Sequence, residues 1–160
     1  MSDDIEKNHQ DAIIRADSLY RKKDRTRTGY KFVSEYRFKQ LTAEISKRGA
    51  IILRGGDEVE EYLDKRMADA LTVNDILFFR QQVTLSEVLE EVFHFEQNLR
   101  KANDDKHAVL RVILNEIEAK KYLLSNAAKY KIPRKETTET KEQLHYYDEM
   151  LKKWEERHHV

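Results

Sequence analysis

The chain has 160 residues, of which 39% are hydrophobic and 38% are charged, and its 30 basic and 30 acidic residues give a formal net charge of zero. This length and composition predict one soluble domain with a modest core. The zero net charge favours neither a nucleic-acid partner nor an anionic membrane, because both bind basic surfaces. The absence of cysteine excludes thiolate metal sites and cysteine nucleophiles, and it leaves imidazole and carboxylate groups as the metal ligands to search for.

No apolar run approaches the ~20 residues that span a bilayer. The N-terminal residues also lack the basic and apolar regions of a secretory signal. We therefore expect a cytoplasmic protein, or one that leaves the cytoplasm by a route that its sequence does not display. The sequence does not predict an oligomeric state.

Two helical segments joined by a basic loop begin the chain. Apolar residues at helical spacing predict a polar helix over Asp3–Lys23, and Asp24–Gly29 is expected to form a basic loop. This loop is interpreted either as a phosphate or partner contact or, with more support, as a plain solvated connection, because aromatic residues are absent from it. Tyr30–Lys47 is predicted to be helical and to stop at Gly49, and its two apolar arcs allow a break near Arg37.

The middle third is the only part of the chain with the pattern of β-strands. Ala50–Leu53 predicts a short buried strand, and Asp57 is expected to cap a helix over Glu58–Met67. Leu71–Val73 and Ile76–Arg80, separated by a turn-forming pair of residues, predict two further strands. Helices on both sides of a small sheet of roughly two to four strands indicate an α+β fold.

Thr84–Arg100 is predicted to form the helix that carries the chemistry. Thr84 and Glu87 have the spacing of a capping box, which marks the start of this helix. At about 100° per residue, a continuous apolar stripe runs along one side of it. The opposite side carries four polar residues, Glu87, Glu90, Glu91 and His94.

Glu90, Glu91 and His94 form the pattern E-E-x-x-H, which is the zinc-protease signature H-E-x-x-H with a carboxylate in place of the first imidazole. One interpretation is a solvated helix side on which Glu90 and His94 form an ordinary i,i+4 pair. The pattern taken alone favours it. The other interpretation has Glu90 and His94 pointing at a divalent cation while Glu91 polarises a bound water.

The next predicted helix, His107–Tyr130, contains two candidates for a further ligand. Glu116 and Glu118 lie 22 and 24 residues after His94, about where zinc sites with a glutamate ligand take their carboxylate. The two are about 200° apart around the helix, so only one is expected to face the site. Glu116 falls within the apolar arc, which favours it because a buried carboxylate needs a partner.

The last predicted helix, Thr137–Trp154, supports a competing hypothesis. Glu142 and His145 form a second E-x-x-H motif, and two such motifs with single glutamates from other helices are typical of di-metal carboxylate bundles. The strand pattern within Gly49–Gln82 disfavours this hypothesis, because those bundles are all helical.

Three stretches within Arg37–Leu151 resemble one known family. They are RFKQLTAEISKRGAIILRG, VTLSEVLEEVFHFEQ and LNEIEAKKYLLSNAAKYKIPRKETTETKEQLHYYDEML. The most specific part of this resemblance combines E-E-x-x-H-x-x-Q, which is Glu90–Gln97, with E-x-E-A-x-x-x-L-x-x-N, which is Glu116–Asn126. Together they look like the zincin-like metallopeptidase toxin domains of bacterial polymorphic toxin systems.

The resemblance implies a zincin-like core over residues 30–160, preceded by an N-terminal helix and basic loop over residues 1–29. It implies that Glu90 and His94 are metal ligands, that Glu91 is the general base, and that Glu116 or Glu118 is the third ligand. Gln97 and Asn115 are expected beside them. Ordinary zincins place histidine where Glu90 stands, and the resulting oxygen-rich ligand set is less selective for zinc.

The leading functional hypothesis is therefore a metal-dependent peptide hydrolase that uses a divalent metal, with zinc as the first candidate. Its expected partner is a peptide or protein substrate. The alternative is a catalytically inactive zincin-like fold that acts as a protein interaction or regulatory module, and the second alternative is the di-metal carboxylate protein.

Overall fold

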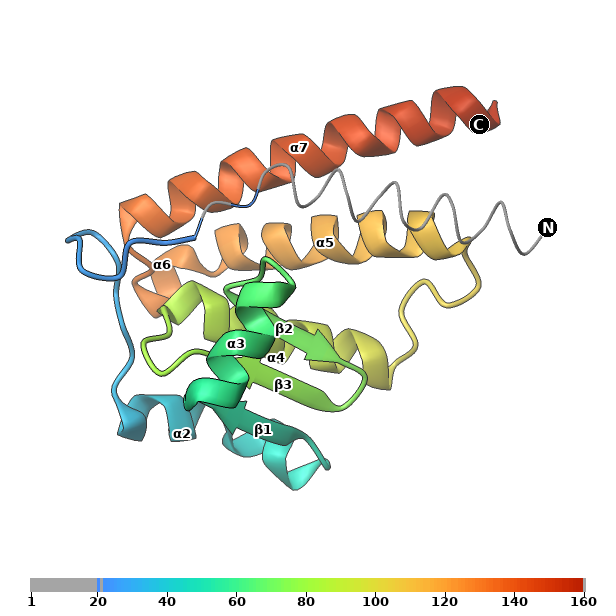
Figure 1. Cartoon of the computed structure of the whole chain (residues 1–160). Helices are drawn as coiled ribbons and strands as arrows, with labels where there is room; N and C mark the ends of the chain where they lie inside the picture. Colours follow the sequence, from blue (N-terminus) through green and yellow to red (C-terminus); the bar gives the residue numbers. More distant parts are fainter. Residues whose placement is uncertain (1–19, 21, 160) are drawn as a thin grey trace.

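Figure 1 shows the fold of the chain as a computed structural model, which describes Tyr20 and residues 22–159. The helix predicted over Asp3–Lys23 lies almost entirely outside these residues, and Lys22 and Lys23 themselves are not helical. The helices and strands of the described part are α2 (Glu35–Lys47), β1 (Ile51–Arg54), α3 (Asp57–Lys65), β2 (Ala70–Val73), β3 (Ile76–Phe79), α4 (Leu85–Leu99), α5 (Ala108–Ser125), α6 (Ala127–Tyr130) and α7 (Arg134–His158).

The three strands form one mixed sheet in the order β1-β3-β2. β2 and β3 pair antiparallel across a tight turn, as the sequence predicts, and β1 pairs with β3 in parallel. The prediction of a buried first strand is wrong. Ile51 and Leu53 of β1 are 49% and 39% exposed, because β1 is an edge strand and α3 packs mainly on β3.

The helices cover both faces of this sheet and add further layers on one side. α3 lies on one face, and α4 with α2 lies on the other (Figure 1). α5 packs against α4, and α7 runs alongside α5 over most of its length. The predicted α+β class is confirmed, and α4 lies in the interior between the sheet and α5. Among the helices of the described residues, none combines the length and the apolar character that a membrane crossing needs.

Two apolar clusters stabilise these layers. The larger one joins the sheet to α2 and α4, and its fully buried members include Leu77, Phe79 and Val88. The smaller one joins α5 to α7 through Ile113 and Met150. Because α4 buries its apolar stripe against the sheet, the polar side that carries Glu90 and His94 faces α5 rather than solvent.

The region predicted to be helical from Tyr30 to Lys47 begins as extended chain. α2 starts only at Glu35, where the hydroxyl of Ser34 accepts a hydrogen bond from the Arg37 amide and caps the helix. The break suggested by the two apolar arcs is real, but it falls at Ser34 and not near Arg37.

Residues 31–33, ahead of this cap, lie beside residues 83–85. The backbone amide of Val33 donates to the Val83 carbonyl at 3.0 Å, and the amide of Leu85 donates to the Lys31 carbonyl at 2.9 Å. These bonds make a short antiparallel pairing immediately before α4. The start of α4 is therefore fixed by a chain segment some fifty residues earlier.

The N-cap of α4 is the predicted one, whereas the N-cap of α3 is not. Thr84 and Glu87 form the predicted capping box at the start of α4, in which each side chain accepts a hydrogen bond from the other residue's amide. The cap predicted for α3 is wrong, because the N-cap is Gly56, at a φ of +86° that glycine adopts easily. Asp57 is the first helical residue, where its charge suits the helix dipole.

The basic loop is not a plain solvated connection. Asp24 and Arg27 are exposed, but the side chains of Lys23 and Arg25 are only 13% and 11% exposed. Both contact the buried carboxylate of Glu87, at 2.8 and 3.1 Å. Arg25 of the loop and Lys23 just before it therefore hold the first turn of α4, a contact that the favoured interpretation of this segment missed.

Candidate metal centre

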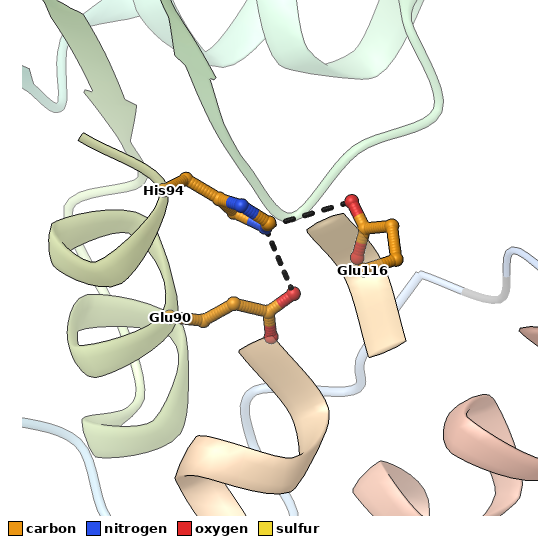
Figure 2. Close-up of side chains that lie close together, drawn as sticks. All are labelled: Glu90, His94 and Glu116. Atoms are coloured by element: carbon orange, nitrogen blue, oxygen red, sulfur yellow. Dashed lines mark ion pairs between the residues drawn. The ribbon is translucent and has the colours of Figure 1, made fainter. Parts of the chain in front are cut away.

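Three side chains from α4 and α5 meet at the interface of these helices (Figure 2). The Nε2 atom of His94 lies 3.6 Å from Oε1 of Glu90 and 3.5 Å from Oε1 of Glu116. One possible ligand atom from each of the three lies within 4.8 Å of the others. Of the two candidates on α5, Glu116 joins this group and Glu118 does not.

The spacing and the chemistry of these atoms fit a divalent metal ion. Zinc ligands at 2.0–2.2 Å in a tetrahedron lie about 3.3 to 3.6 Å from one another. The two distances from His94 Nε2 match this range. One imidazole nitrogen with two carboxylate oxygens is also a usual donor set, although it discriminates poorly between zinc and other divalent ions. Glu90, His94 and Glu116 could therefore bind a metal ion, whose identity the donor set does not fix.

Gln97 sets the orientation of the His94 ring. Its Oε1 atom lies 2.7 Å from Nδ1 of His94, while its Nε2 atom donates to the Asn115 carbonyl at 2.9 Å and to Glu118 at 3.2 Å. Since the amide nitrogen of Gln97 is fully used as a donor, its oxygen accepts a hydrogen bond from the N–H group at Nδ1 of His94. The Nε2 atom of His94 is then the one directed at the two carboxylates, which is how metal-binding histidines are held.

Of the two residues that the resemblance implies beside the ligands, Gln97 contacts His94 directly, whereas Asn115 contacts Gln97. Asn115 acts through its backbone carbonyl on Gln97, while its side chain accepts from Asn103. Glu118 lies outside the group of possible ligands and contacts Gln97 instead.

Opposite charges dominate the electrostatics of the group. Burial by itself lowers the pKa of His94, but the carboxylates of Glu116 and Glu90 outweigh burial and raise this pKa to about 10. For Glu90, burial acts to raise the pKa, while Lys120 and His94 together hold it well below its usual range. At neutral pH, with no metal bound, the His94 ring is therefore protonated and Glu90 is ionised.

Lys120 is a member of the site that the sequence analysis missed. Its side chain is 5% exposed and extends from α5, one turn after Glu116. The Nζ atom contacts the Glu90 carboxylate and lies 3.2 Å from Oε2 of Glu116. Burial acts to lower the pKa of Lys120, but the charges of Glu90 and Glu116 outweigh burial and raise this pKa. The Lys120 side chain is therefore an ammonium ion. An i,i+4 Glu–Lys pair is the sequence signal for this contact, but such pairs are common on solvated helices.

Glu91 lies next to the group, on the side of the sheet. Its side chain is buried, and the Thr72 hydroxyl of β2 donates to its Oε1 atom at 3.3 Å. Burial raises the pKa of Glu91 to about 8. The charge of His94 acts to lower this pKa, and the charges of Glu90 and Glu116 act to raise it. A carboxyl group with its pKa near neutrality can take up and release a proton under ordinary conditions.

A cavity of about 300 Å³ opens beside these residues. Residues from β2 and the chain before it line one wall, and residues of α7, among them Tyr147, line another. The carboxylates of Glu90, Glu91 and Glu116 and the ammonium of Lys120 all border it. Two of the three possible ligands, Glu90 and Glu116, can therefore be reached from the cavity, whereas His94 does not line it.

The second E-x-x-H motif does not join this centre. Glu142 and His145 are exposed on α7, and neither belongs to the group formed by Glu90, His94 and Glu116. The arrangement that a di-metal carboxylate protein requires is thus not seen among the described residues. Comparison with protein-family models, with curated proteins and with solved structures gave no match to this chain.

Proposed function

We propose that this chain is a metal-dependent peptide hydrolase of the zincin type. The observation that carries the proposal is the approach of Glu90, Glu116 and His94 at the spacing of metal ligands, beside the buried carboxyl group of Glu91. Glu90, His94 and Glu116 would hold a divalent metal, which would supply Lewis acidity to polarise a peptide carbonyl and to lower the pKa of a bound water.

The residues of the chain have separate tasks in this proposal. Gln97 keeps Nε2 of His94 directed at the two ligand carboxylates. Glu91 accepts the proton of the attacking water and transfers it to the nitrogen of the leaving amine as the C–N bond breaks. Thr72 holds the Glu91 carboxyl group against β2, so that its position is set by the sheet as well as by α4.

The position of β2 supports a peptide as the substrate. β2 is an edge strand that pairs with β3 on one side only within the described residues, and Ala70 and Leu71 at its start line the cavity. An extended peptide can bind such an edge through backbone hydrogen bonds, and this would bring a peptide bond next to Glu91. A toxin-like role stays a prediction from the family resemblance.

One observation favours a second candidate, a zincin-like module that binds a partner without catalysis. Lys120 and the protonated His94 ring together neutralise the charges of Glu90 and Glu116, so the group is electrostatically balanced without a metal ion. In this second candidate the acidic cavity binds a basic segment of another protein.

Metal analysis tests the proposal. The protein is purified without chelator and without a histidine tag, and we expect about one transition-metal ion per chain and cleavage of a peptide mixture as measured by mass spectrometry. Glu91→Gln should keep the metal and lose cleavage by at least about 100-fold, because general-base catalysis contributes about that much. His94→Ala should lose the metal.

Glu142→Gln, which changes an exposed carboxylate on α7, is the matched control and should behave as the wild type. A protein that contains no transition metal and takes up none at a slight excess would contradict the hydrolase proposal and favour the binding module.

A further inference from the structure

The ammonium group of Lys120 competes with a metal ion for the same carboxylates. Its Nζ atom contacts both Glu90 and Glu116, which supply two of the three possible ligands. A carboxylate oxygen that accepts from an ammonium group must turn from it to coordinate a metal, or share its charge between two cations. Two cations that share one pair of carboxylates repel each other strongly in a site of low solvent exposure.

We propose that the ammonium group of Lys120 occupies the place of a metal ion between Glu90 and Glu116. A divalent metal must displace this ammonium group from the two carboxylates in order to bind. This inference rests on the proposed function and adds the regulation of its metal site. Lys120 balances one of the two carboxylate charges without metal, and its displacement costs free energy, so a higher metal concentration is needed to occupy the site.

The structure gives the displaced side chain a place to move. Lys120 borders the cavity of about 300 Å³, which is also lined by polar side chains of α7, among them Thr140 and Gln143. A lysine side chain is long and flexible, so its ammonium group can turn from the carboxylates into this polar space. Displacement therefore needs a change of side-chain rotamers and no change in the fold of α5.

The neighbouring residue provides a matched control. Lys121 follows Lys120 on α5 but is exposed, and its replacement removes the same charge from the same helix outside the site. Lys120→Met removes the ammonium while keeping a side chain of similar length, and Lys120→Arg retains a positive charge near the carboxylates.

Zinc affinity is measured by calorimetry or with a competing chelator for the wild type, Lys120→Met, Lys120→Arg and Lys121→Met. We expect Lys120→Met to bind Zn²⁺ at least about tenfold more tightly than the wild type, which is the scale on which groups around the ligands alter metal affinity. Lys120→Arg should not gain affinity, and Lys121→Met should match the wild type. Circular dichroism establishes that each variant is folded.

The outcomes separate this inference from the hydrolase proposal. Zinc binding by the wild type with equal or weaker binding by Lys120→Met would overturn the displacement while leaving the hydrolase intact. Zinc binding by Lys120→Met alone would support Lys120 as the excluding cation and overturn the hydrolase. Binding by neither protein would overturn both.

A measurement on the wild type covers the case in which Lys120→Met does not fold. The buried ammonium of Lys120 is followed by lysine side-chain NMR while one equivalent of Zn²⁺ is added. Loss of its contacts with the carboxylates supports the proposal. An ammonium signal that stays unchanged after zinc has bound contradicts it.

Discussion

Glu136 of α7 accepts a hydrogen bond at 3.0 Å from the backbone amide of Ser86, in the first turn of α4 and 50 positions earlier in the chain. Its other carboxylate oxygen accepts from the Lys31 amide at 2.7 Å. The first amides of a helix have no partner within the helix and carry its positive dipole end. A carboxylate from the last helix therefore stabilises the start of the helix that bears the candidate metal centre.

Glu136→Ala should lower the free energy of unfolding by about 2 to 4 kcal/mol, because the buried amide of Ser86 and the partly buried amide of Lys31 lose a charged acceptor. Urea denaturation measures this change. The control is Glu142→Ala on the exposed side of the same helix, which should alter stability by less than about 0.5 kcal/mol. Equal effects of the two substitutions would contradict the role given to Glu136.

The contact of Arg25 with Glu87 predicts a coupling energy between the basic loop and α4. Both side chains are largely buried, at 11% and 6% exposure, so the interaction is weakly screened. A double-mutant cycle with Arg25→Met and Glu87→Gln should give about 1 to 3 kcal/mol. The exposed i,i+4 pair of Glu61 and Lys65 is the comparison, and its cycle should give less than about 0.5 kcal/mol. Similar coupling in the two cycles would show that the loop is not held by α4.

Gln97→Leu should weaken zinc binding by about 10- to 100-fold, because the His94 ring loses the acceptor that fixes it. Titration with Zn²⁺ against a competing chelator measures the affinity. Gln82→Leu changes an exposed glutamine just before α4 and should leave the affinity unchanged. An unaltered affinity in Gln97→Leu would mean that His94 is oriented by the helix alone or does not bind the metal.

The raised pKa of His94 makes the stability of the metal-free protein depend on pH. In the unfolded chain this ring loses its proton near its ordinary pKa of 6.5, whereas the folded protein retains the proton up to about pH 10. The folded state therefore binds more protons between these values, and stability falls as the pH rises. The stabilisation from His94 is fully present below pH 6.5 and decreases as the pH rises from 6.5 to about 10.

Urea denaturation in the presence of a chelator, at intervals from pH 6 to pH 10, measures this effect. The wild type should lose about 2 to 4 kcal/mol more than His94→Gln over this range. Replacement of the exposed His145 by glutamine gives the matched control, which should follow the wild-type curve. Parallel curves for the wild type and His94→Gln would contradict the ion pairs of His94 with Glu90 and Glu116.

Local signals account for the parts of the fold that the sequence predicts. The capping box of Thr84 and Glu87 and the β2–β3 hairpin depend on residues a few positions apart, and both occur as expected. Failures arise where distant segments decide the outcome. Ile51 is exposed because of its place at the sheet edge, and Arg25 is buried because Glu87 is turned toward it.

The residues of the candidate site fall into the same two groups, those placed by local spacing and those placed by the packing of distant segments. Glu90 and His94 share one helix, so their approach follows from helical spacing, whereas the contact with Glu116 depends on how α5 packs on α4. The choice of Glu116 over Glu118 could be argued from its place in the apolar arc. The insertion of Lys120 could not, because its partner Glu90 lies 30 positions away on another helix.

The antiparallel pairing of residues 31–33 with residues 83–85 also has a consequence for hydrogen exchange. A helix end with only local contacts frays, and its first amides exchange by brief local opening. At α4 the amide of Leu85 is bonded to Lys31, and that of Ser86 is bonded to Glu136. Exchange of each amide therefore requires that α4 separate from a distant segment, which is residues 31–33 for Leu85 and α7 for Ser86. The beginning of α4 should therefore exchange more slowly than a helix end with only local contacts, and the candidate metal ligands lie one turn beyond it.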